Sequence, residues 1–427
     1  MKIRERGVKE IVLRTFFALF CACPYCLIGA PTVKDLMVTD VTTRSFCVVW
    51  ASSEASYTDY PYIYVYDDPN GLVPTANTAI TPQPVESGNS AIAVLAENNG
   101  VLKVRVAGLS PDTTYYFRTV TTSKSTKETT LYPAEPPFPS VTTETLTVRD
   151  RLSGEDAVPF SNDLIIGECF LDDGITPAEG TILIATVEGG DYPLSTFVGD
   201  GIAPPYAVID LNNVFGRGSR KNIEVTEGEH ITLLNFRGTL GNSVVNHAAP
   251  LDEGLSAIKR PQSAIVPGWN MISFPLEPSN VNIAVLLAPL WDKFASIWEY
   301  NTQLNKWFRY DRFGPPFLND LSELHAGKGY WIVMNEEASL RISGQFHDSA
   351  APIYASWNLV GYHSLESWGI PAVMDPIQSV LKCIWSYETI FDEWRRYSPS
   401  GPPFLNDLEW VAPGKAYWIE ATGTGEW

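Results

Sequence analysis

The sequence predicts a mainly β, multi-domain protein in which β-sandwich domains precede a duplicated β-rich module with short helices. Three observations predict this fold class. The 427 residues exceed what one hydrophobic core usually organises. Short runs of β-branched and aromatic residues alternate with turn clusters, and Gly (31 residues) and Pro (32 residues) are frequent. The C-terminal part of the chain repeats itself, which indicates two copies of one unit.

The first 30 residues have the pattern of a signal peptide. Basic residues open the chain, an apolar segment follows, and Gly29-Ala30 offers a small-residue cleavage site. A membrane anchor is the alternative, but Pro24 and the shortness of the apolar run disfavour it. A lipid anchor at Cys23 is a second alternative, in a poor lipoprotein box. We therefore expect residues 1–30 to be removed, and the protein to be extracellular or periplasmic with no membrane span after cleavage.

Charge and cysteine content exclude several classes of partner and site. The formal net charge is −19 at pH 7, and cleavage would remove five basic but only two acidic residues. A chain this acidic repels nucleic acid and anionic lipid. Cys47, Cys169 and Cys383 would remain, far apart and odd in number, which favours three single buried thiols over a disulfide framework.

Residues 31–145 are predicted to form the first sandwich, with strand-like runs at 46–50, 62–66 and 102–106. A Leu-x-Pro-x-Thr-x-Tyr run ends at Tyr115, whose ring is expected to fill the core edge and whose hydroxyl is expected to tie down the preceding loop. Together with Trp50, this segment resembles a fibronectin type III domain. The resemblance implies a sandwich fold and no particular activity, because such domains serve as spacers, adhesion modules and enzyme appendages.

Residues 146–258 are predicted to form a second sandwich. The order of its strand-like runs resembles the Ig-like or prealbumin-like modules of bacterial secreted proteins. Asp172-Asp173-Gly174 and Gly199-Asp200-Gly201 lack the spaced carboxylates of a calcium loop, so plain turns are favoured over a cation site. The polar, Pro-containing segment from Ala248 to Pro267 is expected to link this sandwich to the last region.

The last region is a tandem repeat, with copy 1 at residues 259–348 and copy 2 at residues 349–427. Four motifs recur at an offset of 87 residues, among them an identical octapeptide at Gly314 to Leu321 and Gly401 to Leu408. Trp269-Asn270 recurs as Trp357-Asn358 at an offset of 88. The repeat resembles an uncharacterised tandem module of secreted bacterial proteins, which implies secretion and β structure but no chemistry.

Each copy is predicted to contain a strand, a short helix, a hairpin and a further strand. In copy 1 the helix is indicated by apolar spacing over 283–290, and the hairpin spans 297–310. We expect the two copies to pack as a pseudo-symmetric pair that shares one core. Copy 2 ends at Trp427 and therefore lacks, or borrows, the closing strand with which copy 1 continues.

The repeated hairpins carry the candidate ligand-binding residues. Residues two apart on a strand share a face, so aromatic side chains gather on one side of each hairpin: Trp298, Tyr300 and Trp307 in copy 1, and Trp385, Tyr387 and Trp394 in copy 2. These rings suit either a platform for sugar rings or the core of a small sheet. Strict repetition favours the core interpretation, because an exposed groove would more often diverge between copies.

No catalytic motif accompanies these aromatic residues. The chain has no Gly-x-Ser-x-Gly elbow and no His-Glu-x-x-His pair, and no cofactor or metal site is predicted. Lys328 and Lys415 each follow a turn glycine and are expected to reach solvent. The sequence thus predicts a non-enzymatic secreted or cell-surface protein for adhesion, surface architecture or extracellular interaction, with an extracellular protein or polysaccharide as partner and an oligomeric state left open. A carbohydrate-binding protein is the alternative, and an accessory part of a secreted hydrolase is less favoured.

Overall fold

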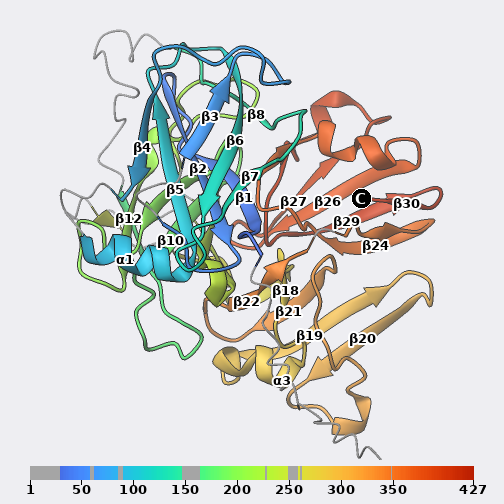
Figure 1. The fold of residues 1–427 in the computed structure, drawn as a ribbon. Coiled ribbons are helices and arrows are strands. Elements are labelled where there is room, and N and C mark those ends of the chain that lie inside the picture. Colours follow the sequence, from blue (N-terminus) through green and yellow to red (C-terminus); the bar gives the residue numbers. More distant parts are fainter. Residues whose placement is uncertain are drawn as a thin grey trace, which may run out of the picture.

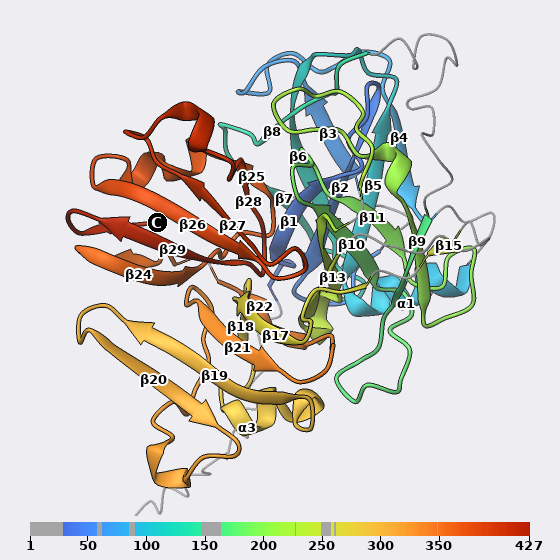
Figure 2. The ribbon, with the colours of Figure 1, turned by 180° about the vertical axis from the view of Figure 1, so that it is seen from behind.

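The computed structural model describes residues 29–57, 62–84, 90–146, 164–226, 228–248, 258–259, 262–347 and 349–427. Residues 1–28, with Cys23 and most of the predicted signal peptide, lie outside this part. The strands form many separate, mostly antiparallel sheets with few short helices, which confirms the predicted fold class. Figures 1 and 2 show the N-terminal sandwiches on one side and the two copies, one above the other, on the opposite side. No helix of the described part is long and apolar enough to cross a membrane.

The first sandwich pairs a β1-β2-β5-β4 sheet with a β3-β6-β7 sheet, in which β8 also pairs with β6. Its elements are β1 (Val33–Thr39), β2 (Ser45–Ser52), β3 (Tyr62–Tyr66), β4 (Ala79–Gln83), α1 (Ser90–Asn99), β5 (Val101–Ala107), β6 (Thr114–Thr122), β7 (Thr129–Tyr132) and β8 (Ser140–Thr142). Helix α1 is an addition that the sequence analysis did not anticipate. Trp50 and Tyr115 are buried in the core, and the Tyr115 hydroxyl accepts a hydrogen bond from the Ser110 N–H at 2.9 Å. The expected role of Tyr115 is thereby confirmed.

The second sandwich is built around a long antiparallel sheet of order β11-β10-β13-β14-β22-β18, with a smaller β12-β9-β15 sheet beside it. Its own elements are β9 (Leu164–Glu168), β10 (Ile182–Val187), β11 (Leu194–Phe197), β12 (Tyr206–Asp210), η1 (Leu211–Asn213), β13 (His230–Phe236), η2 (Gly238–Leu240), β14 (Asn242–Ala248), β15 (Ile258–Lys259) and β16 (Gln262–Ser263). The expected irregular linker therefore contains two short strands in its described part. The Asp173 carboxylate holds its turn by accepting from the N–H groups of Ile175 and Thr176 at 2.9 and 2.8 Å.

Copy 1 extends the large sheet of the second sandwich. Its last strand, β22 (Arg341–Phe346), pairs with β14, and β18 (Leu276–Pro278) pairs with β22 in turn. Strand β22 thus ties copy 1 to the second sandwich. In copy 2 the corresponding chain ends after a short pairing of β23 (Pro352–Ile353) with β30 (Gly425–Glu426), and Trp427 is buried.

The two sandwiches meet where an ion pair of the first, Asp40 with Lys103, is hydrogen-bonded to Ser195 of the second. Asp40 lies 2.9 Å from the Lys103 ammonium, and its carboxylate also accepts from the Ser195 N–H at 2.7 Å. Lys103 in turn donates to the Ser195 carbonyl at 2.9 Å. Burial opposes ionisation of Asp40, but Lys103 and the hydrogen bonds from Ser195 outweigh it, so the pKa of Asp40 is lowered. This contact fixes the first sandwich against strand β11 of the second.

Glu144, at the end of the first sandwich, is a buried carboxyl group whose two oxygens have no hydrogen-bond partner within the described chain. Burial, with a contribution from the charge of Asp191, raises the pKa of Glu144 to about 9. The folded state therefore holds this proton more tightly than the unfolded state does. The resulting stability is complete below the unfolded pKa and is lost as the pH rises through about 9.

Replacing Glu144 by glutamine is expected to stabilise the protein more at high pH than at low pH, because glutamine carries no charge to bury. Thermal unfolding midpoints of both proteins, measured from about pH 5 to about pH 9, test this. The difference between variant and wild type should grow with pH. A constant difference would show that the Glu144 carboxyl does not titrate in this range.

The two copies share one order of elements. Copy 1 has β17 (Gly268–Ile272), α3 (Ile283–Leu286), η3 (Ala288–Leu290), β19 (Phe294–Asn301), β20 (Lys306–Asp311), η4 (Pro316–Leu318) and β21 (Tyr330–Met334). Copy 2 has β24 (Ser356–Gly361), β25 (Trp368–Gly369), η5 (Ala372–Ile377), β26 (Leu381–Glu388), β27 (Glu393–Tyr397), η6 (Pro403–Leu405), β28 (Trp410–Val411) and β29 (Ala416–Ala421). Both main sheets have equivalent orders, β17-β21-β19-β20 and β24-β29-β26-β27. The predicted strands, helix and hairpin of the repeat are confirmed.

A pseudo-two-fold axis relates the copies. The Ser273 N–H donates to the Gly414 carbonyl at 2.9 Å, and the equivalent Gly361 N–H donates to the Gly327 carbonyl at 3.1 Å. The predicted pseudo-symmetric pairing is thereby confirmed. Where these strands cross, equivalent residues face each other, and in each such pair one copy carries glycine: Ser273 with Gly361, and Ala416 with Gly329.

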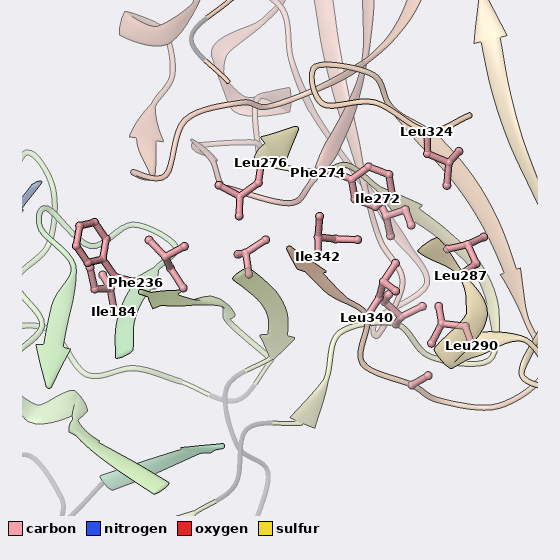
Figure 3. Close-up of a cluster of buried hydrophobic side chains, with 14 of the residues drawn as sticks. Ile184, Phe236, Ile272, Phe274, Leu276, Leu287, Leu290, Leu324, Leu340 and Ile342 are labelled. Atoms are coloured by element: carbon pink, nitrogen blue, oxygen red, sulfur yellow. The ribbon is translucent and has the colours of Figure 1, made fainter. Parts of the chain in front are cut away.

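The expectation that the copies share one core is wrong. The core of copy 1 is continuous with both sandwiches, and Figure 3 shows it running from Ile184 and Phe236 of the second sandwich to Leu287 and Leu290 of copy 1. Copy 2 has a separate core of its own. Between them lies only a small cluster around Met271, with aromatic rings packed against it. The core of copy 1 is continuous with that of the second sandwich because β22 pairs with β14 and adds its apolar side chains to the same core.

Candidate functional site

Each copy has a sheet with one aliphatic face and one aromatic face. In β21 the side chains of Tyr330 and Ile332 are buried, and Trp331 between them is only partly buried. The same alternation holds in β19, where Ile297 is buried and Trp298 is partly exposed. Because alternate residues of a strand point to opposite faces, the aliphatic residues face each copy's core and the tryptophans face outward. The sequence repeats this pattern in β29 and β26.

The aromatic faces of the two copies together form one surface groove with two pockets, each of about 500 Å³. We call the whole the aromatic groove. Pocket A is lined by Trp269, Trp298, Trp307, Trp331, Tyr387, Asp392 and Trp394. Pocket B is lined by Tyr300, Trp307, Trp357, Trp385, Trp394 and Trp418. Each pocket takes four tryptophans from one copy and is completed by the hairpin of the other, and Trp307 and Trp394 belong to both pockets.

Ring contacts across the groove obey the pseudo-two-fold symmetry. The Trp331 ring lies 5.5 Å from Tyr387 and 5.8 Å from Trp394, between centroids. The equivalent Trp418 ring lies 5.4 Å from Tyr300 and 5.8 Å from Trp307. Each hairpin thus lays its Tyr and Trp against the central tryptophan of the other copy. Contacts of this kind between rings contribute about 0.5–1.5 kcal/mol each beyond the area they bury.

The tips of the two hairpins are built alike but differ in charge. In copy 1 the Tyr300 hydroxyl donates to the Asn305 side-chain oxygen at 2.7 Å. In copy 2 the Tyr387 hydroxyl donates to the Asp392 carboxylate, and this hydrogen bond raises the pKa of Tyr387. The Thr302 hydroxyl also donates to the Trp357 carbonyl at 2.7 Å, which fixes the first hairpin tip on copy 2.

The interpretation of the repeated hairpin aromatics as core is wrong. Trp307 is 40% exposed and Trp394 is 44% exposed, and Trp298, Tyr300, Trp385 and Tyr387 are partly exposed. All six predicted residues nevertheless come together, at the aromatic groove. Strict repetition here goes with a surface that both copies build jointly, and not with a shared core.

Sequence reasoning missed four tryptophans and one carboxylate of the groove. The residues are Trp269, Trp331, Trp357, Trp418 and Asp392. The four tryptophans are two repeated pairs, Trp269 with Trp357 at an offset of 88 and Trp331 with Trp418 at an offset of 87, and Trp331 and Trp418 alternate with buried residues. That alternation was the available signal. No repeated signal in the sequence pointed to Asp392, because its equivalent in copy 1 is an asparagine.

The identical octapeptide closes the open edge of each hairpin. The Asp320 carboxylate accepts from the Arg309 N–H at 2.8 Å, and the Asn319 side chain accepts from the Asp311 N–H at 2.8 Å. Asn406 and Asp407 make equivalent bonds to β27 in copy 2. These bonds occupy backbone groups of an edge strand that would otherwise be open to pairing. Phe317 and Phe404, in the same segments, are each 84% exposed.

Comparisons with known proteins add no relative. No protein-family model matches the chain, and no curated protein matches it either.

The expected solvent exposure of the two turn lysines is wrong for Lys415. Lys415 is buried, and its ammonium lies 3.0 Å from Glu188 of the second sandwich and 2.6 Å from Glu388 of β26. Burial opposes its charge, but the two carboxylates raise the pKa of Lys415. The equivalent Lys328 has a half-exposed side chain and pairs with Glu299 at 2.7 Å. The copies differ because only copy 2 places this turn against the second sandwich.

The cysteines lie outside the groove's lining. Cys47 and Cys169 are buried free thiols, and burial raises the pKa of each to about 12. Cys383 is partly exposed, so the expectation of three buried thiols is wrong for this one; its sulfur accepts from the indole N–H of Trp385 at 3.3 Å. Within the described ranges, no group of three or more His, Cys, Asp or Glu side chains is placed to hold a metal ion.

The arrangement of the groove suits binding. Among the described residues that line the two pockets, Asp392 is the one ionisable carboxylate, and the rest of the lining is aromatic. Such a surface offers large, rigid apolar contact with a few polar groups at its rim. It can hold a ligand by the faces of its rings and orient it by the groups at the hairpin tips.

Proposed function

We propose that this chain is a secreted, non-catalytic protein that binds an extracellular glycan through the aromatic groove. The observation that carries the proposal is the exposure of repeated tryptophans in a concave surface: Trp269 is 50% exposed, and the pocket it lines measures about 500 Å³. Tryptophan side chains are normally covered, because burying a large aromatic ring is strongly favourable. Several half-exposed rings in one groove therefore indicate a ligand that covers them.

A glycan fits this surface because sugar rings have apolar C–H faces and polar edges. The faces stack on aromatic rings, and the edges hydrogen-bond at the rim. Both pockets adjoin at Trp307 and Trp394, so one chain of sugar units can contact both. The predicted signal peptide and the acidic net charge of −19 agree with an extracellular ligand that is neither nucleic acid nor an anionic membrane.

The resemblance of residues 31–145 to a fibronectin type III domain supports a spacer or presenting role for the N-terminal half. In this proposal the two sandwiches hold the tandem module away from the site of attachment, and the module binds. The buried contact of Lys415 with Glu188 keeps the groove in a fixed orientation to the second sandwich. The N-terminal half then contributes rigidity and not specificity.

An extracellular protein partner is the second candidate. The observation that favours it is the exposure of Phe317 and Phe404, each 84%, within the octapeptide that is identical in both copies. The hydrogen bonds of Asn319 and Asp320 explain why their part of the octapeptide is retained, but they do not require a phenylalanine at Phe317. A protein that docks on these two side chains would make the chain an adhesion or architecture module.

Binding to a panel of soluble and insoluble polysaccharides tests the proposal. The double variant Trp307→Ala, Trp394→Ala removes the two rings shared by both pockets. Because truncation of a tryptophan at a binding hot spot costs about 2 kcal/mol or more, we expect retention to weaken by about thirtyfold or more.

The matched control is the double variant Phe317→Ala, Phe404→Ala, which removes two exposed aromatic side chains of the same repeat outside the groove. It should retain glycans as the wild type does. Circular dichroism should show that both variants are folded, since the two tryptophans are nearly half exposed, the two phenylalanines are 84% exposed, and none of the four belongs to a hydrophobic core. Failure of the wild-type protein to bind any glycan of the panel, or equal retention by the tryptophan variant, contradicts the proposal.

A further inference from the structure

The two pockets of the aromatic groove are equivalent by pseudo-symmetry except in charge. Asp392 lines pocket A, and its equivalent in copy 1 is Asn305, which is hydrogen-bonded to Tyr300 of pocket B. Arg309 and Arg396 correspond: Arg309 lies over the Trp298 ring at 5.3 Å, and Arg396 lies over the Trp385 ring at 5.4 Å. Glu420 lies opposite Trp357 in copy 2 where copy 1 has Val333 opposite Trp269, but the Lys382 ammonium lies 2.8 Å from the Glu420 carboxylate. Asp392 thus gives pocket A one negative charge more than pocket B has from the equivalent position.

The rings of pocket A surround its space and do not form one flat platform. Trp269 and Trp331 meet at 84°, and Trp331 and Trp394 meet at 63°. Walls of this kind turn more than one ring face toward the same volume. The faces of aromatic rings attract positively charged organic groups, most strongly when the group is partly desolvated. A carboxylate at the mouth of such a pocket adds a direct attraction for a cation, and the net charge of −19 favours its approach.

We propose that pocket A is the subsite for a sugar unit that carries a protonated amine, and that pocket B takes a neutral unit. This inference rests on the proposed glycan-binding function and narrows its ligand to glycans that contain amino sugars. The amine would lie against the ring faces of pocket A, with the Asp392 carboxylate as its partner. In pocket B the neutral Asn305 provides no such partner. Asp392 would thereby also set the direction in which a glycan chain lies along an otherwise pseudo-symmetric groove.

The two copies themselves supply the variants for a test. Asp392 and Asn305 both have a left-handed backbone, with φ of 54° and 48°, and each accepts a hydrogen bond from the tyrosine of its hairpin. Asp392→Asn therefore reproduces in copy 2 an arrangement that copy 1 already has, and Asn305→Asp does the converse. Neither substitution demands a new backbone conformation, so each changes charge with little change in shape.

The experiment compares oligomers of glucosamine with oligomers of N-acetylglucosamine of the same length, at a mildly acidic pH where the amines are protonated. Acetylation removes the positive charge. Quenching of tryptophan fluorescence gives the two dissociation constants for each protein, and their ratio is the measure. For wild type the ratio should favour glucosamine oligomers. Asp392→Asn should reduce this preference about three- to tenfold, and Asn305→Asp should increase it.

Three results would be decisive against the inference. Binding of both oligomers with a preference that Asp392→Asn leaves unchanged overturns it, while the proposed glycan function stands. A wild-type preference for the acetylated oligomer overturns it in the same way. If the wild type binds neither oligomer, the amine subsite is also overturned, and binding to the other polysaccharides of the panel then decides separately whether the glycan function survives.

Discussion

Replacement of Lys415 by methionine is expected to lower the free energy of unfolding of the tandem module by about 3–5 kcal/mol. The Lys415 ammonium lies between two carboxylates, 3.0 Å from Glu188 and 2.6 Å from Glu388, and its side chain is buried. Methionine matches the stem of lysine without its ammonium group, and so leaves both carboxylates buried without the cation that they hydrogen-bond. Removing one partner of a buried ion pair costs more than the pair contributes, because the remaining charges stay desolvated.

The equivalent lysine of copy 1 provides the control. Lys328→Met removes the same side chain from the same turn, but the Lys328 side chain is half-exposed and pairs with one carboxylate, that of Glu299, among the described residues. Its cost should be at most about 2 kcal/mol. Denaturant unfolding followed by tryptophan fluorescence reports on this region, because every tryptophan except Trp50 lies after residue 265. Equal losses for the two variants would contradict the role assigned to Lys415.

Substitution of Gly361 by alanine is expected to destabilise the pair of copies by about 2–3 kcal/mol and to weaken ligand binding in both pockets. A Cβ atom at Gly361 would lie 2.5 Å from the Cβ of Ser273 and 2.6 Å from the Lys328 carbonyl oxygen. The second neighbour is backbone, so the two copies would have to move apart. Both pockets are completed across this contact, and a shift of the copies changes both at once.

A double-mutant cycle with Ser273 tests this explanation. Adding Ser273→Gly to Gly361→Ala removes the closer of the two clashes and should recover part of the lost stability, since the affected atoms are neighbours. The Lys328 carbonyl clash remains, so recovery is expected to be incomplete. If the double variant is as unstable as the sum of the two single variants, Ser273 is not what excludes a side chain at Gly361.

Short-range sequence patterns predicted the helices and strands well, because these elements depend mainly on residues that are close together in the chain. Alternation and turn residues located the strands β2, β3 and β5, and apolar spacing located α3. The hydroxyl of Tyr115 bonds the N–H five residues before it, as expected from its motif. The same bond recurs in the copies, where Tyr330 accepts from the His325 N–H and Tyr417 from the Ala412 N–H, each at 2.8 Å. Each of these hydrogen bonds joins two residues that are five apart, so the sequence alone can predict it.

Predictions about burial failed where distant segments meet. The sequence favours a core position for Trp307 and a solvent-exposed one for Lys415. In the structure the tryptophan is exposed and the lysine is buried. No residue near Lys415 in the sequence indicates that it contacts Glu188, which lies in another domain. The expected linker likewise contains β16, because its partner β14 belongs to the sheet of the second sandwich. Whether a residue is buried depends on which segment packs against it. The sequence does not say which segment that is.

By itself the sequence determined that this protein is mainly β and that its last region is one unit present twice. Periodicity and repetition can be detected in the sequence alone, without the tertiary structure. Only the tertiary structure decided that the aromatic faces of the two copies meet as one open groove. It also explains why one residue of each crossing pair is glycine, Gly361 opposite Ser273 and Gly329 opposite Ala416, because two Cβ atoms there would lie too close together.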